Sequence, residues 1–201
     1  MKPFVLGITG GIGSGKSCVG RLLASYCSAP LIDVDQCCRH LLEIDQPGWH
    51  ALRSVFGRIF FQPDGSVDRE TLRRRIFEDA EIRRQVDNIL HPLARGEFRM
   101  QINRRHSRLI LAEIPLLYEA GWRDEVDEVL VVYARRVARC CRIMRRDKVT
   151  RLEAVRAIDA QMSLEKKAAR AELVIDNSGR WAESRIRVIS LGEDLSLRIL
   201  D

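Results

Sequence analysis

The fold is decided by residues 10–17, Gly10-Gly11-Ile12-Gly13-Ser14-Gly15-Lys16-Ser17, which match the phosphate-binding pattern G-x-x-x-x-G-K-[ST] at every fixed position. An apolar run at residues 4–8 precedes this stretch and predicts a short buried strand. Apolar residues at positions 19, 22, 23 and 26 follow it with the spacing of a helix that has one buried face. Strand, glycine loop and helix are the context that the pattern requires, so the sequence predicts a site for a nucleoside triphosphate.

Each residue of this loop has an expected task. The glycines allow successive backbone N–H groups to turn inward and to form an anion-binding nest at a helix N-terminus. Lys16 is expected to reach the β- and γ-phosphates, and the Ser17 hydroxyl is expected to ligate Mg²⁺. The predicted nucleotide-binding residues are Gly11, Ile12, Gly13, Ser14, Gly15, Lys16 and Ser17.

Two other interpretations of this stretch are weaker. A glycine turn with a solvated lysine would match the pattern by chance in about one chain in a hundred of this length, and the flanking strand and helix lower that figure. The dinucleotide fingerprint G-x-G-x-x-G is absent, because Gly11, Gly13 and Gly15 do not have its spacing.

Composition is that of a soluble globular protein with one domain and room for an inserted subdomain. The 201 residues are 46% apolar and 31% charged, and no apolar stretch approaches the roughly 18 residues of a membrane span. The start, Met1-Lys2-Pro3, runs directly into the first expected strand and leaves no room for a signal peptide. Six cysteines without a secretion signal indicate reduced thiols, so we expect a cytoplasmic protein with no membrane partner.

The basic charge balance favours an anionic small substrate over nucleic acid. Net charge is +6, and 29 of the 34 basic residues are arginine, whose planar fork suits phosphate oxygens. A basic protein could also bind nucleic acid. The arginines, however, are spread along the chain and interleaved with acidic residues, and few aromatic residues are present to stack on bases. We therefore expect no nucleic-acid partner.

Two aspartates follow the second predicted strand, which is short and ends at Leu31-Ile32. Asp33 and Asp35 would emerge at its carboxyl edge, where open α/β sheets bind their ligands. One of them could accept the proton of a substrate hydroxyl or help to position Mg²⁺, and the alternative for either residue is a plain helix N-cap.

Residues from about 40 to 105 predict a mostly helical insertion, which is too long for a plain crossover between strands. One arginine of Arg73-Arg74-Arg75 is expected to face the substrate, with the others on a solvated face. His91-Pro92 is expected to interrupt the last helical pattern of this segment, and His91 is either packed there or in contact with a ligand.

Three further apolar runs, at residues 109–114, 129–133 and 173–175, bring the number of expected strands to five. Strands that alternate with helices predict an α/β fold with a doubly wound parallel sheet. Glu113 lies within residues 109–114, the third expected strand along the chain, and Glu119 follows it; both are candidate outer-shell partners of Mg²⁺.

A helix rich in arginine is expected after residues 129–133. Residues 151–168 predict another helix, and a C-terminal helix is expected around Ile186 and Ile189. In the arginine-rich helix, the predicted buried face consists of Val137, Cys140, Cys141 and Met144. The arginines of its polar face would lie near the phosphate loop, which favours phosphate contact; they are Arg135, Arg136, Arg139, Arg142, Arg145 and Arg146.

With these pieces in place, the chain resembles the dephospho-CoA kinase family from residue 4 to about residue 180. The phosphate loop alone is generic, whereas its combination with the His-Pro and Pro-Leu-Leu segments is specific. Departures from the family pattern, such as Cys18, Val34 and Tyr118, remove no group that the chemistry needs. The matching stretches are residues 7–17, Ile32-Asp33-Val34-Asp35, Leu72-Arg73 with Ile76-Phe77, Leu90-His91-Pro92, Pro115-Leu116-Leu117 with Glu119, Arg142 with Arg146-Asp147, Gln161, and Val174-Ile175-Asp176-Asn177.

The resemblance implies a P-loop kinase that uses ATP and Mg²⁺ to phosphorylate the ribose 3′-hydroxyl of dephospho-CoA, the last step of coenzyme A synthesis. It implies a nucleotide-binding core at residues 1–39 and 107–201, with a lid within about 139–170. It also implies a helical insertion at residues 40–106 that binds dephospho-CoA. We expect a monomer or a weak homo-oligomer.

The resemblance further implies roles for individual residues. Asp35 would be the general base, Arg142 and Arg146 would act with Lys16 on the phosphates, and Asn177 would lie near the adenine of ATP. The residues implied in substrate binding are Asp33, Arg73, His91, Pro115 and Leu116.

Two other functions stay open on the sequence alone. Another small-molecule P-loop kinase would act on a nucleoside monophosphate or a similar acceptor, although the insertion and the His91-Pro92 segment argue against it. A nucleotide switch or regulatory ATPase would hydrolyse ATP slowly without any acceptor. Acceptor specificity distinguishes these functions.

Overall fold

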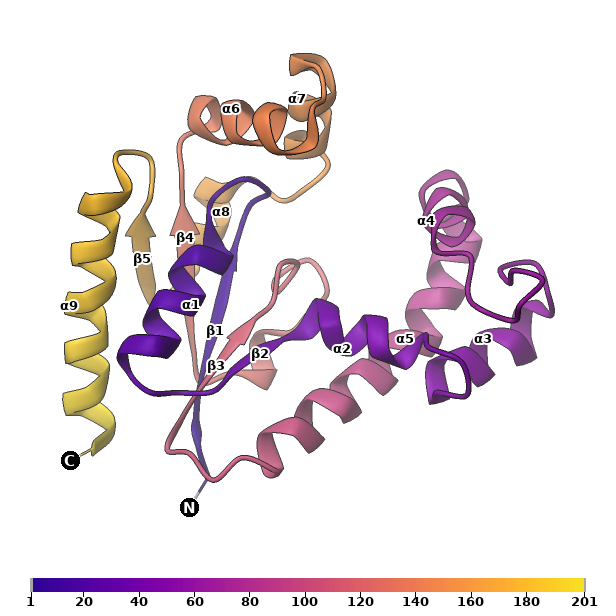
Figure 1. Cartoon of the computed structure of the whole chain (residues 1–201), viewed down its shortest axis with the longest axis horizontal. Helices are drawn as coiled ribbons and strands as arrows, with labels where there is room; N and C mark the ends of the chain where they lie inside the picture. The colour runs from indigo at the N-terminus through magenta and orange to yellow at the C-terminus, as the bar shows by residue number, and fades with distance from the viewer. Residues whose placement is uncertain (1, 201) are drawn as a thin grey trace. The chain divides into compact units, whose positions relative to one another are not determined.

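In the computed structural model, which describes residues 2–200, five parallel strands form one sheet in the order β2-β3-β1-β4-β5 (Figure 1). The predicted doubly wound parallel sheet is therefore confirmed, and β1, which leads into the phosphate loop, is its central strand. Met1, where the sequence predicts no signal peptide, lies outside the described residues. The strands are β1 (Phe4–Gly10), β2 (Leu31–Asp33), β3 (Leu109–Glu113), β4 (Glu128–Tyr133) and β5 (Leu173–Asp176).

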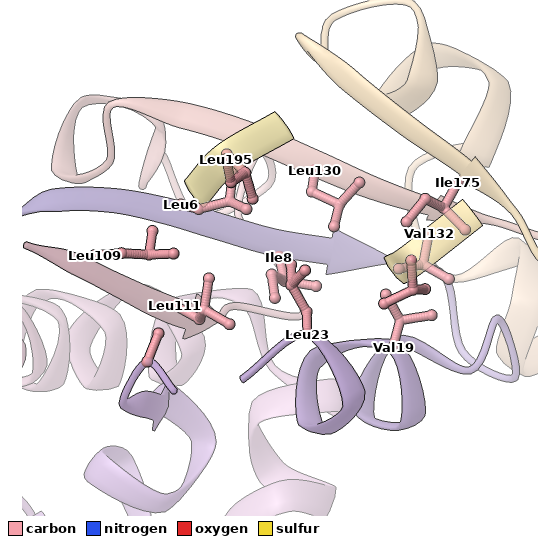
Figure 2. Close-up of a cluster of buried hydrophobic side chains, with 12 residues drawn as sticks. Leu6, Ile8, Val19, Leu23, Leu109, Leu111, Leu130, Val132, Ile175 and Leu195 are labelled. Carbon is pink, nitrogen blue, oxygen red and sulfur yellow. The ribbon is translucent and has the colours of Figure 1, made fainter. Parts of the chain in front are cut away.

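The central strands are buried because they are apolar on both faces, as is typical of parallel strands covered by helices. Figure 2 shows Leu6 and Ile8 of β1 in one cluster with Leu130 and Val132 of β4. Two helices, α1 (Lys16–Tyr26) and α9 (Trp181–Leu200), complete this cluster with Val19, Leu23, Val188 and Leu195.

The register of the sheet brings the carboxyl ends of its strands together. Glu113, the last residue of β3, pairs with Ile8 of β1 and with Asp33 of β2. On the other side of β1, Gly10 pairs with Val132 of β4. Polar residues that end β2 and β3 therefore lie on the edge from which the phosphate loop leaves the sheet.

Residues Val34–Arg104 form a helical unit of their own, distinct from the unit of Met1–Asp33 and Arg105–Asp201 that contains the sheet. The helical unit has its own apolar core of Trp49, Leu52, Phe60, Leu72 and Val86. Its helices are α2 (Val34–Leu41), α3 (Pro47–Phe56), α4 (Arg69–Glu78) and α5 (Ala80–Asn103).

The expected interruption at His91-Pro92 is wrong, because α5 continues through both residues. Proline lacks the N–H that would bond the carbonyl four residues earlier, at a cost of about 3 kcal/mol in a helix interior. Val86 lies before the proline, and Ala94 and Phe98 lie after it, all three buried. Burial of apolar side chains on both sides of Pro92 offsets this cost and keeps the helix continuous.

The C-terminal helices of the sheet unit differ from those predicted from the sequence, both in their buried faces and in where they begin and end. In α6 (Arg136–Asp147), Val137 is 74% exposed and the buried residues are Arg139, Cys140 and Ile143. The stretch predicted as one helix is two, α7 (Arg151–Asp159) and α8 (Leu164–Ala168), because the Ser163 side chain caps a new helix at the backbone N–H of Lys166. In α9, Ile186 is exposed and Val188 lies in the core.

None of the helices within residues 2–200 has the length and apolar composition needed to cross a membrane.

We expect Leu130→Ala to destabilise the sheet unit, because the Leu130 side chain is 0% exposed and its removal leaves a cavity in the central cluster. The free energy of unfolding should fall by about 2–5 kcal/mol, measured by urea denaturation. Leu197→Ala, at a position of α9 that is 66% exposed, is the matched control and should change it by less than about 0.5 kcal/mol. Equal losses for the two variants would contradict this placement of the core.

Candidate functional site

The loop between β1 and α1 is shaped by glycines in left-handed backbone conformations. Gly13 has φ 76° and Gly15 has φ 91°, values that side-chain-bearing residues rarely adopt. Space is also restricted: a Cβ on Gly13 would lie 2.9 Å from the backbone oxygen of Arg139, and one on Gly15 would collide with the Asn177 amide. Glycine is therefore required at both positions by conformation and by packing.

The same loop presents backbone donors without protein acceptors. Within residues 2–200, the N–H groups of Gly13, Gly15, Lys16 and Ser17 make no hydrogen bond to the protein. The first turn of α1 contains no acidic residue and has no side-chain cap. A helix N-terminus with free N–H groups and no protein anion carries the partial positive charge that binds phosphate.

Ser17 and Lys16 meet at the carboxylate of Glu113. The Ser17 hydroxyl donates to Glu113 Oε1 at 2.6 Å, and Lys16 Nζ lies 3.8 Å from the same oxygen. Glu113 is only 7% exposed, so its negative charge is balanced locally by Lys16. Because Ser17 gives its proton to Glu113, the lone pairs of its oxygen are available to a hard cation such as Mg²⁺, and this donor set fits the ion.

Arg142 and Asn177, both predicted from the sequence, are brought to the loop. The Arg142 guanidinium donates to the carbonyls of Gly13 and Ser14 at 3.3 Å each and to the Asn177 carbonyl at 2.7 Å. The buried Asn177 amide donates to the Ser14 carbonyl at 2.8 Å. Both side chains hold loop carbonyls in place, in addition to any contact with a ligand.

Arg146 lies elsewhere on α6. Its guanidinium forms two hydrogen bonds with the carboxylate of Asp147, at 2.7 and 2.8 Å, and its side chain is 63% exposed. Hydrogen bonding to Asp147 raises the pKa of Arg146, and the same contact lowers the pKa of Asp147. No hydrogen bond joins Arg146 to the phosphate loop within the described residues.

Two further residues contact the loop. Arg139 was expected near it only as one of six arginines on a polar helix face, and Gln161 was assigned no role. Arg139 Nε donates to the Ile12 carbonyl at 2.9 Å, and the Gln161 side-chain oxygen accepts from the Ile12 N–H at 2.8 Å. The Ile12 peptide is thus held on both sides. A signal for Arg139 was available, because Ile143 lies four residues later on the same helix face and is buried.

Lys167 of α8 is a fully buried cation in the same unit. Its ammonium lies 2.8 Å from Glu119 Oε1 and donates to the Pro115 carbonyl at 3.2 Å, an oxygen that also accepts from the Thr9 hydroxyl at 3.2 Å. Burial lowers the pKa of Lys167, and the hydrogen bond to Glu119 opposes that shift. Glu119, a candidate outer-shell partner of Mg²⁺, is the residue that neutralises Lys167 beside the turn after β3.

The remaining predicted residues lie in two places. Pro115 and Leu116 form the turn after β3, with Leu116 46% exposed, and Asp33 ends β2. In the helical unit, Asp35 is in the first turn of α2 and Arg73 is exposed on α4. His91 of α5 lines a pocket of about 420 Å³ together with Asp87, Asn88, Pro92, Arg95 and Arg99.

Comparison with known proteins identifies relatives along nearly the whole chain. A family model described as dephospho-CoA kinase matches residues 4–183. The dephospho-CoA kinase of Geobacter sulfurreducens is 42% identical over 190 residues, covering 92% of this chain and 94% of that protein. A solved structure from Thermus thermophilus is 33% identical, with a TM-score of 0.85 and coverage of 98% of both chains. A dephospho-CoA kinase from Campylobacter jejuni, 24% identical with a TM-score of 0.72 over 96% of both chains, supports the fold.

A pair of loop substitutions tests whether the backbone forms this site. Gly15→Ala should lower the affinity for ATP at least about tenfold, because its Cβ would meet Asn177 and strain a left-handed residue. Ser14→Ala should leave the affinity within about twofold and keep or slightly raise the free energy of unfolding, because the buried Ser14 hydroxyl has no protein partner. Calorimetric titration with ATP and thermal melts measure both effects. A large loss of affinity in Ser14→Ala would contradict a backbone cradle.

Proposed function

The chain belongs to the dephospho-CoA kinase family, and from this premise we propose that it transfers the γ-phosphoryl group of ATP to the ribose 3′-hydroxyl of dephospho-CoA. Members of this family phosphorylate dephospho-CoA to coenzyme A in the final step of coenzyme A biosynthesis, so the chain is a kinase. The observation that carries the proposal at the level of the site is the cluster of free loop N–H groups beside Lys16, Ser17 and Glu113.

Nucleotide phosphates are assigned to the phosphate loop. Its N–H groups would bind phosphate oxygens, and Lys16 would reach the β- and γ-phosphates. Ser17 would hold Mg²⁺, with Glu113 orienting the Ser17 hydroxyl. When bound, Mg²⁺ supplies positive charge to the phosphate oxygens. Phosphoryl transfer depends mainly on such positioning and charge stabilisation, which these residues supply.

We assign to Asp35 the role of general base, which accepts the proton of the acceptor hydroxyl. Transfer forms a bond between the ribose 3′-oxygen and the γ-phosphorus, breaks the bond to the β–γ bridging oxygen, and releases ADP. The 3′-hydroxyl proton would pass to the Asp35 carboxylate as the new bond forms. Asp33, at the end of β2 beside Glu113 in register, is assigned to substrate binding.

Residues of the C-terminal half would bind and close over the nucleotide. Arg142 and Arg146 are assigned to the lid of residues 139–170 and would neutralise phosphate charge, while Asn177 would lie near the adenine. A closed lid excludes the water that would otherwise hydrolyse ATP. Arg142 is well placed for this role because it already lies against Gly13 and Ser14.

The acceptor is assigned to the helical residues 40–106 and to the turn after β3. Arg73 and His91 would contact dephospho-CoA from the helical segment, and Pro115 and Leu116 from the turn. The core would comprise residues 1–39 and 107–201. We place the reaction in the cytoplasm, with dephospho-CoA as the partner molecule, no nucleic acid, and a monomer or weak homo-oligomer.

ADP release with Mg-ATP is the direct test of this function. We expect release with dephospho-CoA and none above background with AMP, CMP or GMP, together with a product heavier by one phosphate in mass spectrometry. The reason is that recognition of the acceptor would be coupled to closure of the lid, so that only the matching acceptor completes the site. Release with a nucleoside monophosphate would point to another P-loop kinase, and equal release without acceptor would point to a nucleotide switch.

The base assignment predicts a separate result for each aspartate. Asp35→Asn removes the proton acceptor while keeping the shape of the side chain, so turnover should fall at least about a hundredfold. Affinity for ATP should stay unchanged, because the loop binds the nucleotide. Steady-state kinetics and ATP titration measure these effects, with Asp33→Asn as the comparison. Near-normal turnover of Asp35→Asn together with a large loss in Asp33→Asn would move the base to Asp33.

A further inference from the structure

Arg139 is a buried arginine that the family-derived assignment leaves without a role. It lies on α6, one turn after Arg136, and is only 5% exposed. A guanidinium is always charged in proteins, so its removal from water must be compensated by hydrogen bonds or by opposite charge. Burial lowers the pKa of Arg139, the direction expected for a cation taken out of water.

The guanidinium lies directly against the phosphate loop. Its Nε donates to the Ile12 carbonyl at 2.9 Å. A Cβ added to Gly11 would collide with the same guanidinium, so the absence of a side chain at Gly11 creates the space that Arg139 fills. The backbone of Arg139 also packs against Gly13. Three consecutive loop residues therefore contact this one arginine.

Most donors of Arg139 have no acceptor in the protein. An arginine has five N–H donors, and within residues 2–200 the only acceptor for this side chain is the Ile12 carbonyl. The Nη1 and Nη2 groups make no protein hydrogen bond, and neither is among the fully buried unpaired polar atoms of these residues, so both remain accessible to water or to a ligand. A nine-tenths buried cation with an open fork beside a phosphate loop is complementary to an anion.

Nearby protein charges do not satisfy Arg139. Glu165 and Asp159 attract it electrostatically, but Asp159 pairs with Arg136 at 2.7 Å and Glu165 accepts from the Tyr133 hydroxyl. Arg136 repels Arg139. In addition, Arg139 and Lys16 both repel the buried ammonium of Lys167, so cations accumulate at this side of the loop.

We propose that Arg139 binds a phosphate group of the nucleotide: Nε holds the Ile12 carbonyl while Nη1 and Nη2 donate to phosphate oxygens. This inference rests on the proposed function, because it requires a nucleoside triphosphate in the loop. It adds a second arginine of α6, besides Arg142, to the phosphate-binding site. The planar fork suits this double role, since it can donate in two directions from a fixed plane.

Arg139→Met tests the inference, because a ligand-binding role predicts a loss of ATP affinity, whereas a purely structural role predicts a loss of stability alone. Loss of charged hydrogen bonds to phosphate should weaken ATP binding by about 10- to 100-fold in calorimetric titration with Mg²⁺ present. The melting temperature without nucleotide should change little, because the hydrogen bond lost from the Ile12 carbonyl is offset by the removal of an incompletely paired charge. The stabilisation produced by saturating ATP in the wild type should shrink accordingly.

Two further variants sharpen the test. Arg139→Lys keeps a positive charge without the fork and should recover only part of the affinity. Arg136→Met is the matched control, because Arg136 is exposed on the same helix and forms a surface ion pair with Asp159; its ATP affinity should stay within about twofold of the wild type.

Specific outcomes would overturn the inference. If wild-type protein binds ATP and Arg139→Met binds it within about twofold, Arg139 is not a phosphate ligand. A fall in the melting temperature without nucleotide, at unchanged ATP affinity, would make Arg139 a purely structural residue. Failure of the wild type itself to bind ATP would instead overturn the proposed function, which separates the two failures.

Discussion

The hydrogen bonding of the loop carbonyls is the constraint on which the site depends. Every backbone carbonyl from Gly11 to Gly15 accepts a hydrogen bond. Backbone N–H groups bond the first and the last of them: Ser14 donates to Gly11, and Cys18 and Val19 donate to Gly15. Side chains bond the three between: Arg139 donates to Ile12, Arg142 to Gly13 and Ser14, and Asn177 also to Ser14. With the carbonyls held, the N–H groups are left to face a ligand. Several of these donors come from α6 and from the end of β5, more than a hundred residues later in the chain. The sheet order, with β4 and β5 on one side of β1, is what delivers them to the loop.

More positive charges lie around the loop than the neighbouring carboxylates balance. Lys16 is near Glu113 and Lys167 is paired with Glu119, whereas Arg139 has only the Ile12 carbonyl as an acceptor within the described chain. Buried cations of this kind weaken the protein without ligand, because each is removed from water. A bound polyphosphate would reverse that effect, so the proposed function predicts that nucleotide binding and stability are coupled in this unit.

The features that follow from local sequence patterns could be predicted from the sequence, whereas those that depend on tertiary contacts could not. The strands, the phosphate loop and the parallel sheet follow from apolar runs and from a backbone pattern, and each is present. Pro92 was misjudged because its local cost is visible in the sequence, while the compensating burial of Val86 and Phe98 is not. Arg139 was placed on a polar face near the phosphate loop, but its burial depends on tertiary contacts that helical spacing does not show. The family resemblance supplied Arg142 and Asn177, but their hydrogen bonds to the loop carbonyls could be found only in the folded structure.

The backbone settings of the two aspartates after β2 support different roles in the proposed reaction. Asp33 pairs in register with Glu113, so the two side chains leave adjacent parallel strands on the same side of the sheet. Two carboxylates in that arrangement repel each other unless a cation lies nearby, which favours Asp33 for a place in the cation and substrate environment. Asp35 is exposed in the first turn of α2, where the helix dipole stabilises a negative charge. A solvent-accessible carboxylate can accept a proton from an alcohol and then release it to water, as each turnover of a kinase requires.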